Sequence, residues 1–211
     1  MIAVPDRSTF LVFALASLAL VVAPGPNLVY IVTRSVSQGR RAGLASAVGV
    51  EAGTLVHITA AAVGLSQLVA TSALAFSVVK YAGAAYLLYL GLRALRRREG
   101  LDLTAATRPL QLPRVFRDGI VVNVLNPKVA LFFLAFLPQF VDPANGAATA
   151  QILALGIVFF GIALTVDILY AIVAGALSGW LRRRPAYLRR QRFVVGGVYL
   201  ALGASAAGAS T

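Results

Sequence analysis

Long runs of apolar residues, separated by short polar or charged connections, dominate the pattern of this chain. Six of these runs have the length of about 20 residues that a helix needs to cross the hydrocarbon core of a membrane. They cover residues 10–33, 43–66, 72–93, 117–138, 149–175 and 192–209. The pattern therefore predicts an all-α fold, in which residues 1–211 form a single membrane domain. The expected protein is a polytopic membrane protein with six transmembrane helices.

Arginine residues gather in every second connection between these runs. The second connection has no charged residue, and the fourth has only Asp142. Because basic connections stay on the cytoplasmic side of a membrane, we expect all three basic connections inside and both chain termini outside. These connections hold Arg34, Arg40 and Arg41, then Arg93, Arg96, Arg97, Arg98, Arg108, Arg114 and Arg117, and finally Arg182, Arg183, Arg184, Arg189, Arg190 and Arg192.

The longest basic connection, residues 96–116, divides the chain into halves of three spans each, 1–95 and 117–211. An odd number of spans forces the halves into opposite orientations, which is the geometry of an inverted repeat. The first span of each half is interrupted, by APGPN at 23–27 and by NPK at 126–128. We therefore expect two inverted three-helix halves with a broken first helix in each half.

The two breaks expose backbone groups inside the membrane. A proline has no backbone N–H to donate, so the carbonyls of Leu20, Val22 and Asn123 lose their helical partners and become available to a cation or an ammonium group. The half-helix that starts near Asn27 offers free amides, which favour a carboxylate. Paired interruptions of this kind indicate a transport site. The alternative is a packing kink, whose exposed groups are satisfied by neighbouring helices.

These breaks define the candidate substrate-binding residues. Asn27, Asn123 and Asn126 supply amide side chains, and the spacing of the last two predicts a shared helix face. Lys128 follows Pro127 directly, so it either balances a substrate carboxylate or pairs with an acidic residue of the protein. The full set is Pro24, Gly25, Pro26, Asn27, Asn123, Asn126, Pro127 and Lys128.

Few ionisable residues lie within the predicted spans, where a charge is costly unless it faces a cavity or a partner. Lys80 lies early in the third span, and we expect its side chain to reach the outer surface. Glu51 and Asp167, one in each half, are candidates to carry a coupling ion, and a structural ion pair is the alternative. His57 is the third ion-coupling candidate, and a hydrogen bond to a neighbouring backbone group or tyrosine is its alternative role.

Small residues recur at spacings that allow helices to approach closely. Ala45, Gly49, Gly53 and His57 form a stripe with four-residue spacing in the second span. The sixth span also contains a set of small residues. This set suits packing either within the bundle or between two copies of the chain, so a homodimer is one of two interpretations. Its members are Gly196, Gly197, Gly203, Ala204, Ala207 and Gly208.

The composition narrows the class of protein. Hydrophobic residues make up 59% of the chain and charged residues only 12%, compared with about 25% charged residues in ordinary soluble domains. This excludes a soluble globular protein. The net charge of +12 is concentrated in the connections, so it indicates topology and contacts with anionic lipids rather than a nucleic-acid surface. The chain has no cysteine, which excludes disulfides and thiolate metal sites.

The motifs indicate neither an enzyme nor a bound cofactor. The sequence has no P-loop of the form G-x-x-x-x-G-K-[ST], so ATP is not the expected energy source. It has neither H-E-x-x-H nor G-x-S-x-G, and His57 has no evident serine or cysteine partner. Glu51 and His57 are six residues apart, which places them about 120° apart around a helix. We therefore expect no metal site.

Five segments follow one another between residues 24 and 141. They are PGPN at 24–27, GRRAG at 39–43, GVEAGTLVH at 49–57, KYAGAAYLLYLGLRALR at 80–96 and NVLNPKVALFFLAFLPQFV at 123–141. In sequence and in order these segments resemble the LysE/RhtB family of bacterial amino-acid exporters. Glu51 matches a variable position of that family's pattern, and the C-terminal third, which contains Asp167, matches only loosely.

The resemblance implies a secondary exporter of amino acids and similar metabolites in the bacterial cytoplasmic (inner) membrane. Export would be an antiport driven by a proton or a sodium ion that moves inward. The partners would be a small amino-acid substrate, which we expect to be neutral, the coupling ion and the lipid bilayer. The alternative is a divalent metal cation exporter of related architecture. Whether Glu51 and Asp167 converge in space discriminates between these two functions.

Overall fold

The structure is a computed structural model that describes residues 7–65, 111–142, 144 and 146–179, together with a few single positions. Those single positions are 78, 81, 85, 88, 89, 92, 200 and 204. The third and sixth predicted spans, apart from these positions, lie outside the described residues. Lys80, most of the connection between the third and fourth predicted spans, and all the arginines between the fifth and sixth predicted spans also lie outside the described residues.

All regular elements within the described ranges are helices. The chain forms α1 (Arg7–Val22), α2 (Pro26–Gln38), α3 (Arg40–Ala60), the π-helical turn η1 (Ala61–Leu65), α6 (Leu112–Val124), α7 (Pro127–Leu131), the π-helical η2 (Phe132–Phe136), the 3₁₀-helical η3 (Leu137–Phe140) and α8 (Ala148–Ala176). The predicted all-α class is therefore confirmed for this part of the chain.

Four of the six predicted spans have counterparts among these helices. Two helices, Arg40–Gly64 and Ala148–Ala176, are each long and apolar enough to cross a membrane. Two further candidates are bent pairs: α1 with α2, bent by 51°, and α6 with α7 and its continuation to Phe140, bent by 45°. The predicted breaks are confirmed as bends at the proline motifs, since a proline cannot continue the helical hydrogen-bond ladder.

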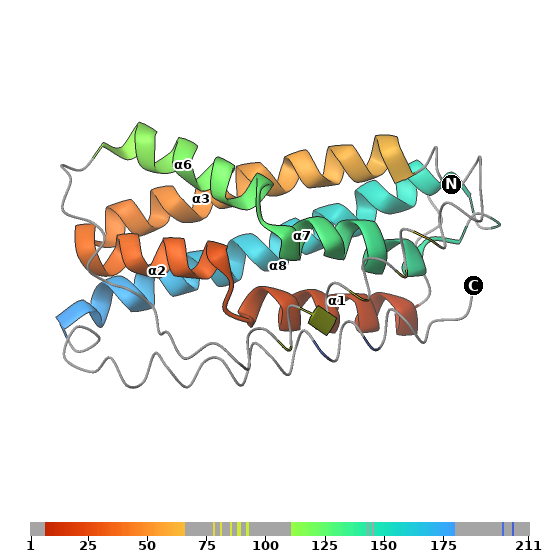
Figure 1. Cartoon of the computed structure of the whole chain (residues 1–211), viewed down its shortest axis with the longest axis horizontal. Helices are drawn as coiled ribbons and strands as arrows, with labels where there is room; N and C mark the ends of the chain where they lie inside the picture. The colour runs from red at the N-terminus through yellow and green to blue at the C-terminus, as the bar shows by residue number, and fades with distance from the viewer. Residues whose placement is uncertain are drawn as a thin grey trace.

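The unbroken helices α3 and α8 run along the whole length of the bundle, and both bends lie near its middle (Figure 1). The two bent pairs run in opposite directions: α1 and α6 approach the middle from opposite ends, and α2 and α7 leave it toward opposite ends (Figure 1). The starts of two half-helices and the ends of two others are thereby brought to the same depth of the bundle.

Glycines let α3 and α6 approach each other closely. A Cβ atom at Gly49 would overlap the backbone carbonyl of Phe116, and one at Gly53 would lie 2.8 Å from the Cβ of Asn123. From the opposite side, a Cβ at Gly119 would lie 3.0 Å from the carbonyl oxygen of Ser46. The predicted stripe of small residues in the second span is therefore a helix-packing surface.

Phenylalanine rings fill the part of the bundle that follows the second break. The ring centroid of Phe132 in η2 lies 5.8 Å from that of Phe13 in α1 and 5.0 Å from that of Phe159 in α8. Phe133 also contacts Phe159, with a centroid distance of 5.1 Å. These rings hold the half-helix after the break against α1 and α8, and close packing of this kind stabilises helix contacts inside a membrane.

The close contact of α3 and α6 predicts the effect of a larger side chain at Gly49. We expect Gly49→Leu to lower stability by at least about 1–3 kcal/mol, because overpacking forces backbone to move. The matched control is Gly161→Leu in α8, where an added Cβ would meet no atom within 4 Å. The measurement is the melting temperature of each purified variant in the same detergent. Equal melting temperatures for the two variants would contradict the proposed contact.

Candidate functional site

The two breaks contact each other directly. The side-chain amide of Asn126 donates a hydrogen bond of 2.8 Å to the side-chain oxygen of Asn27, which is 99 residues away in the sequence. Asn27 lies in the first turn of α2. Asn126 is the N-cap of α7, where its side-chain oxygen accepts from the backbone N–H of Lys128 at 3.0 Å. One asparagine therefore caps its own half-helix and links it to the start of the other.

The carbonyls of the first break accept hydrogen bonds from the second half of the chain. The Lys128 ammonium group donates to the backbone oxygen of Ala23 at 2.6 Å, and the Tyr170 hydroxyl lies 3.4 Å from the oxygen of Val22. The expectation that the Val22 carbonyl is available to a cation is therefore wrong. A neighbouring helix supplies its partner, as bilayer-buried backbone requires.

The carbonyl of the second break is also occupied. The oxygen of Asn123 accepts from the backbone N–H of Asn126 at 2.8 Å and lies 3.0 Å from Nε2 of His57. The expected availability of this oxygen is therefore wrong as well, because the chain turns tightly here and brings its own N–H within reach. Of the two roles considered for His57, the hydrogen bond to neighbouring backbone is the one observed, with Nε2 donating.

The Asn123 side chain faces α3. Its amide nitrogen donates to the carbonyl of Val50 and, at 2.7 Å, to the hydroxyl oxygen of Thr54. Asn123 and Asn126 therefore have different partners, and the expected shared face is wrong because α6 ends at Val124, between them. Asn123 links α6 to α3 and is not part of the pocket lining described next.

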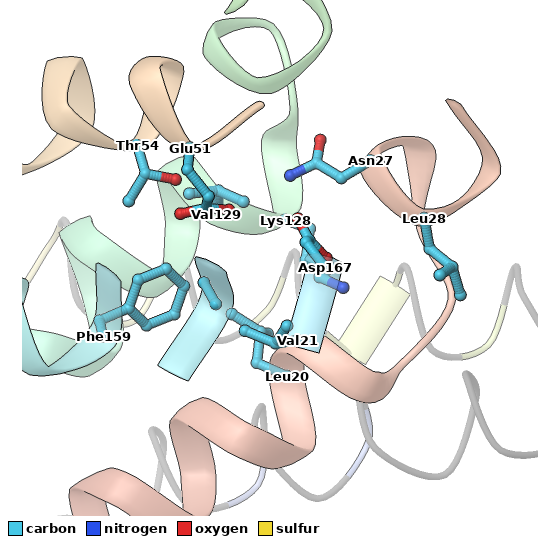
Figure 2. A pocket seen from close by; sticks show the side chains of 11 residues that line it. Leu20, Val21, Asn27, Leu28, Glu51, Thr54, Lys128, Val129, Phe159 and Asp167 are labelled. Carbon is cyan, nitrogen blue, oxygen red and sulfur yellow. The ribbon is translucent and has the colours of Figure 1, made fainter. Parts of the chain in front are cut away.

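A small pocket lies beside the contact between the breaks, with walls from α1, α2, α3, α7 and α8 (Figure 2). Its volume is about 20 Å³, which is room for about one water molecule. An amino acid would therefore enter only if the pocket widens. The polar residues that line it are Asn27, Glu51, Thr54, Lys128 and Asp167, and the apolar ones are Leu20, Val21, Leu28, Val129, Phe159 and Ala163.

The three charged residues of this pocket are deeply buried. Glu51 is 2% exposed, and Lys128 and Asp167 are each 4% exposed. The Glu51 and Asp167 side chains both line this pocket, which has a volume of only about 20 Å³. Residues that belong to separate halves of the sequence thus converge in one pocket. Such residues are costly inside a membrane and usually mark a pathway for a substrate or an ion.

These charges are only partly compensated. Oε2 of Glu51 is buried and has no hydrogen-bond partner among the described residues. Lys128 has no carboxylate oxygen within 4.0 Å of its ammonium nitrogen in the same part of the chain, although it lies beside Asp167 in the pocket. The ammonium group is instead held by the break at Ala23.

Several residues of the predicted set act outside the pocket. Pro24, Gly25 and Pro26 shape the first break, with Gly25 as the N-cap of α2 and Pro26 in its first turn. Pro127 has the same position in α7. His57 stacks on Phe133 at a centroid distance of 6.1 Å and does not line the pocket. These residues position the site rather than face it.

Sequence reasoning missed three lining residues that a regular spacing marks. Thr54 follows Glu51 by three residues, which places both on one face of α3. Phe159 and Ala163 precede Asp167 by eight and four residues, so all three share one face of α8. The spacing from a buried acid would have identified them, had it been applied.

The described residues contain no group of three or more His, Cys, Asp or Glu side chains that could hold a metal ion. Glu51 and Asp167 offer two carboxyl groups, and the ammonium group of Lys128 lines the same pocket. This arrangement presents both signs of charge within one small space.

Comparison with known proteins places the chain among transport proteins. The sequence model of the family described as "LysE type translocator" matches residues 18–208. A "homoserine/homoserine lactone efflux protein" of Salmonella typhimurium is 33% identical over 197 residues, which are 93% of this chain and 95% of the relative. An "uncharacterized membrane protein" of Vibrio cholerae is 32% identical over 198 residues, 94% of this chain and 96% of the relative. No solved structure matches.

The double role of Asn126 predicts different costs for the two asparagines. Asn27→Ala removes one side-chain hydrogen bond, which is worth about 0.5–1.5 kcal/mol. Asn126→Ala removes the same bond and the N-cap of α7, which adds about 0.5–2 kcal/mol. We therefore expect Asn126→Ala to have the lower melting temperature, with Asn27→Ala as its matched control. The cap would be unimportant if both variants melted at the same temperature.

Proposed function

The chain belongs to the LysE-type translocator family, and from this membership and the pocket we propose that it exports amino acids or close derivatives from the cytoplasm. The observation that carries the proposal is the direct contact of the two helix breaks through Asn27 and Asn126, beside a pocket with buried charges of both signs. Salmonella relatives named as homoserine and homoserine lactone efflux proteins support this substrate class.

The pocket suits the carboxylate end and the side chain of a small amino acid. Lys128 supplies a cation, and α2 begins beside it with the positive end of its dipole near Asn27. Leu28, Val129 and Phe159 form an apolar wall for an uncharged side chain. A neutral amino acid fits these features better than a basic one, whose second cation would meet Lys128.

The architecture that we propose is two inverted three-helix halves, residues 1–95 and 117–211, joined by the basic connection 96–116. The opposite directions of the two bent pairs (Figure 1) support it. Rocking of one half against the other would expose the pocket first to the cytoplasm and then to the outside. The basic connections support a location in the bacterial inner membrane with both termini outside.

An inward flow of protons or sodium ions would supply the energy for export. One charge that crosses a potential of 100 mV provides about 2.3 kcal/mol, which sustains a concentration ratio of roughly 50-fold. Glu51 and Asp167 are the candidates for carrying the ion, since both line the substrate pocket. His57 would act indirectly, by holding the second break through the carbonyl of Asn123.

Export of a divalent cation is a second candidate, and one observation favours it. Glu51 and Asp167 converge, as a site for a hard cation requires. The nearby ammonium group of Lys128 opposes it, because it would repel a doubly charged ion. The same cells can test this function by their resistance to added Mn²⁺, Co²⁺ or Zn²⁺, which a cation exporter would increase.

The test of the main proposal is efflux from cells preloaded with labelled amino acids. We expect the wild type to lower the internal amount of at least one amino acid, and we expect both Pro24→Ala/Pro26→Ala and Asn126→Ala/Pro127→Ala to abolish this effect at equal abundance. Pro113→Ala, at an exposed position in the first turn of α6, is the matched control and should export normally. Normal export by both double variants would show that the breaks are only kinks. If the wild type moved no amino acid, the proposal would fail.

A carboxylate contact at Lys128 predicts a change of preference in Lys128→Met. The wild type should prefer an exported amino acid to its carboxamide by about tenfold to a hundredfold, the value of a hydrogen bond to a charged group. The variant should lose most of this preference, because methionine has no charge to pair with the carboxylate. A ratio of two compounds is used because the structural cost of leaving the Ala23 carbonyl without Lys128 affects both equally. The measurement is competition of each compound with labelled efflux. An unchanged ratio would exclude this contact.

A further inference from the structure

Three of the backbone carbonyls at the breaks already accept hydrogen bonds from other parts of the protein. The carbonyl of Ala23 accepts from Lys128, that of Val22 from Tyr170, and that of Asn123 from Asn126 and His57. An ammonium group has three donors and needs acceptors when it leaves water. Side chains of the pocket can supply these acceptors.

Glu51 and Asp167 are the acceptors that the pocket provides. Both carboxyl groups are more than nine-tenths buried, and Oε2 of Glu51 has no partner among the described residues. Val129 and Phe159 form an apolar wall beside these carboxyl groups, in a pocket of about 20 Å³. Figure 2 shows Glu51 entering the pocket from α3 while Asp167 comes from α8.

Two carboxylates so close together, and so far from water, cannot both stay ionised unless a cation lies between them. Lys128 does not bridge the two carboxyl groups, since its ammonium nitrogen has no carboxylate oxygen within 4.0 Å among the described residues and donates to the Ala23 carbonyl instead. In the absence of a ligand, the missing positive charge is a proton shared by the pair. The ammonium group of a substrate brings the same single positive charge as that proton and has three N–H groups that can donate to the two carboxyl groups.

We propose that Glu51 and Asp167 form one site that a proton and the ammonium group of the substrate occupy in turn. When the ammonium group enters, the O–H bond of the protonated carboxyl group breaks and the proton leaves to water, while the ammonium group keeps its own three protons. This inference rests on the proposed function and identifies the coupling ion as the proton. Mutual exclusion at one site leads to exchange when the protein changes orientation only with the site occupied, by the proton or by the ammonium group.

Few charged or titratable groups surround this pair in the part of the chain that the structure describes. Lys128 faces it from α7, and Tyr170 lies one turn after Asp167 on α8 with its hydroxyl at Val22. The lining residues of α1 are apolar, and those of α2 are Asn27 and Leu28. On α3, His57 is turned toward Asn123. Proton release on binding would therefore come from the carboxyl pair or, less directly, from Lys128.

Proton release on binding is the test. The probe is L-homoserine, added to the purified full-length protein in a weakly buffered solution that contains a pH indicator. We expect about one proton per homoserine bound, and affinity that falls about tenfold per pH unit on the acid side of the transition. N-acetyl-L-homoserine, which lacks the ammonium group, should release none.

Variants assign the proton to the pair. Glu51→Gln and Asp167→Asn should each abolish the release and make any remaining homoserine binding independent of pH, whereas Glu51→Asp should retain the release. Asp118→Asn is the matched control, because this acid pairs with Arg34 at 3.5 Å and does not line the pocket. Lys128→Met should bind homoserine more weakly but still release about one proton per homoserine bound; binding without release in this variant, with release retained in Glu51→Gln and Asp167→Asn, would assign the proton to Lys128 and overturn the inference.

The possible failures are distinct. If the wild type binds and exports homoserine but releases no proton, or requires sodium instead, the inference is wrong and the proposed export stands. Release by N-acetyl-L-homoserine, or loss of release in Asp118→Asn, would also overturn it. If the wild type neither binds nor exports homoserine or any other amino acid, the proposed function fails, and the inference fails with it.

Discussion

Backbone groups at the two helix breaks have to find hydrogen-bond partners without water, and the rest of the arrangement depends on how they do so. An unpaired group in the hydrocarbon region costs several kcal/mol. The first break is satisfied by Lys128 and Tyr170 from the second half of the chain, and the second break is satisfied in part by His57 from the first half. The halves are therefore interlocked at the depth where both helices are interrupted. Any movement of one half relative to the other has to exchange these bonds.

The same requirement determines the charges of the pocket. Because the ammonium group of Lys128 is held by a backbone oxygen, it does not neutralise the nearby carboxyl groups of Glu51 and Asp167 by direct contact. The pocket therefore has carboxyl groups, Glu51 and Asp167, that could accept from a positive group, and a cation, Lys128, that could pair with a carboxylate. Because its volume is only about 20 Å³, an amino acid could enter only if the surrounding helices moved apart.

Close helix packing gives this site its geometry. Gly49 and Gly53 allow α6 to lie against α3, and Asn123 then reaches two acceptors on α3 with its side chain. One of these acceptors, Thr54, lies one turn from Glu51 on the pocket face. The position of the acidic residue is thereby tied to the end of the second broken helix. Small residues do this work inside a membrane because helices there associate through close contact rather than through the exclusion of water.

The sequence by itself determined four spans, both breaks and the family, because these depend on local properties: run length, hydropathy and the missing N–H of proline. The predicted run 149–175 differs from α8, Ala148–Ala176, by one residue at each end. The sequence also singled out the buried charges, since ionisable residues are rare in apolar runs. Only the tertiary structure decided their partners. Lys128 donates to a carbonyl 105 residues away, and the Asn123 side chain faces α3 rather than the pocket. Which groups meet in this way depends on the rotation and depth of each helix, and these are fixed by packing between segments that are distant in the sequence.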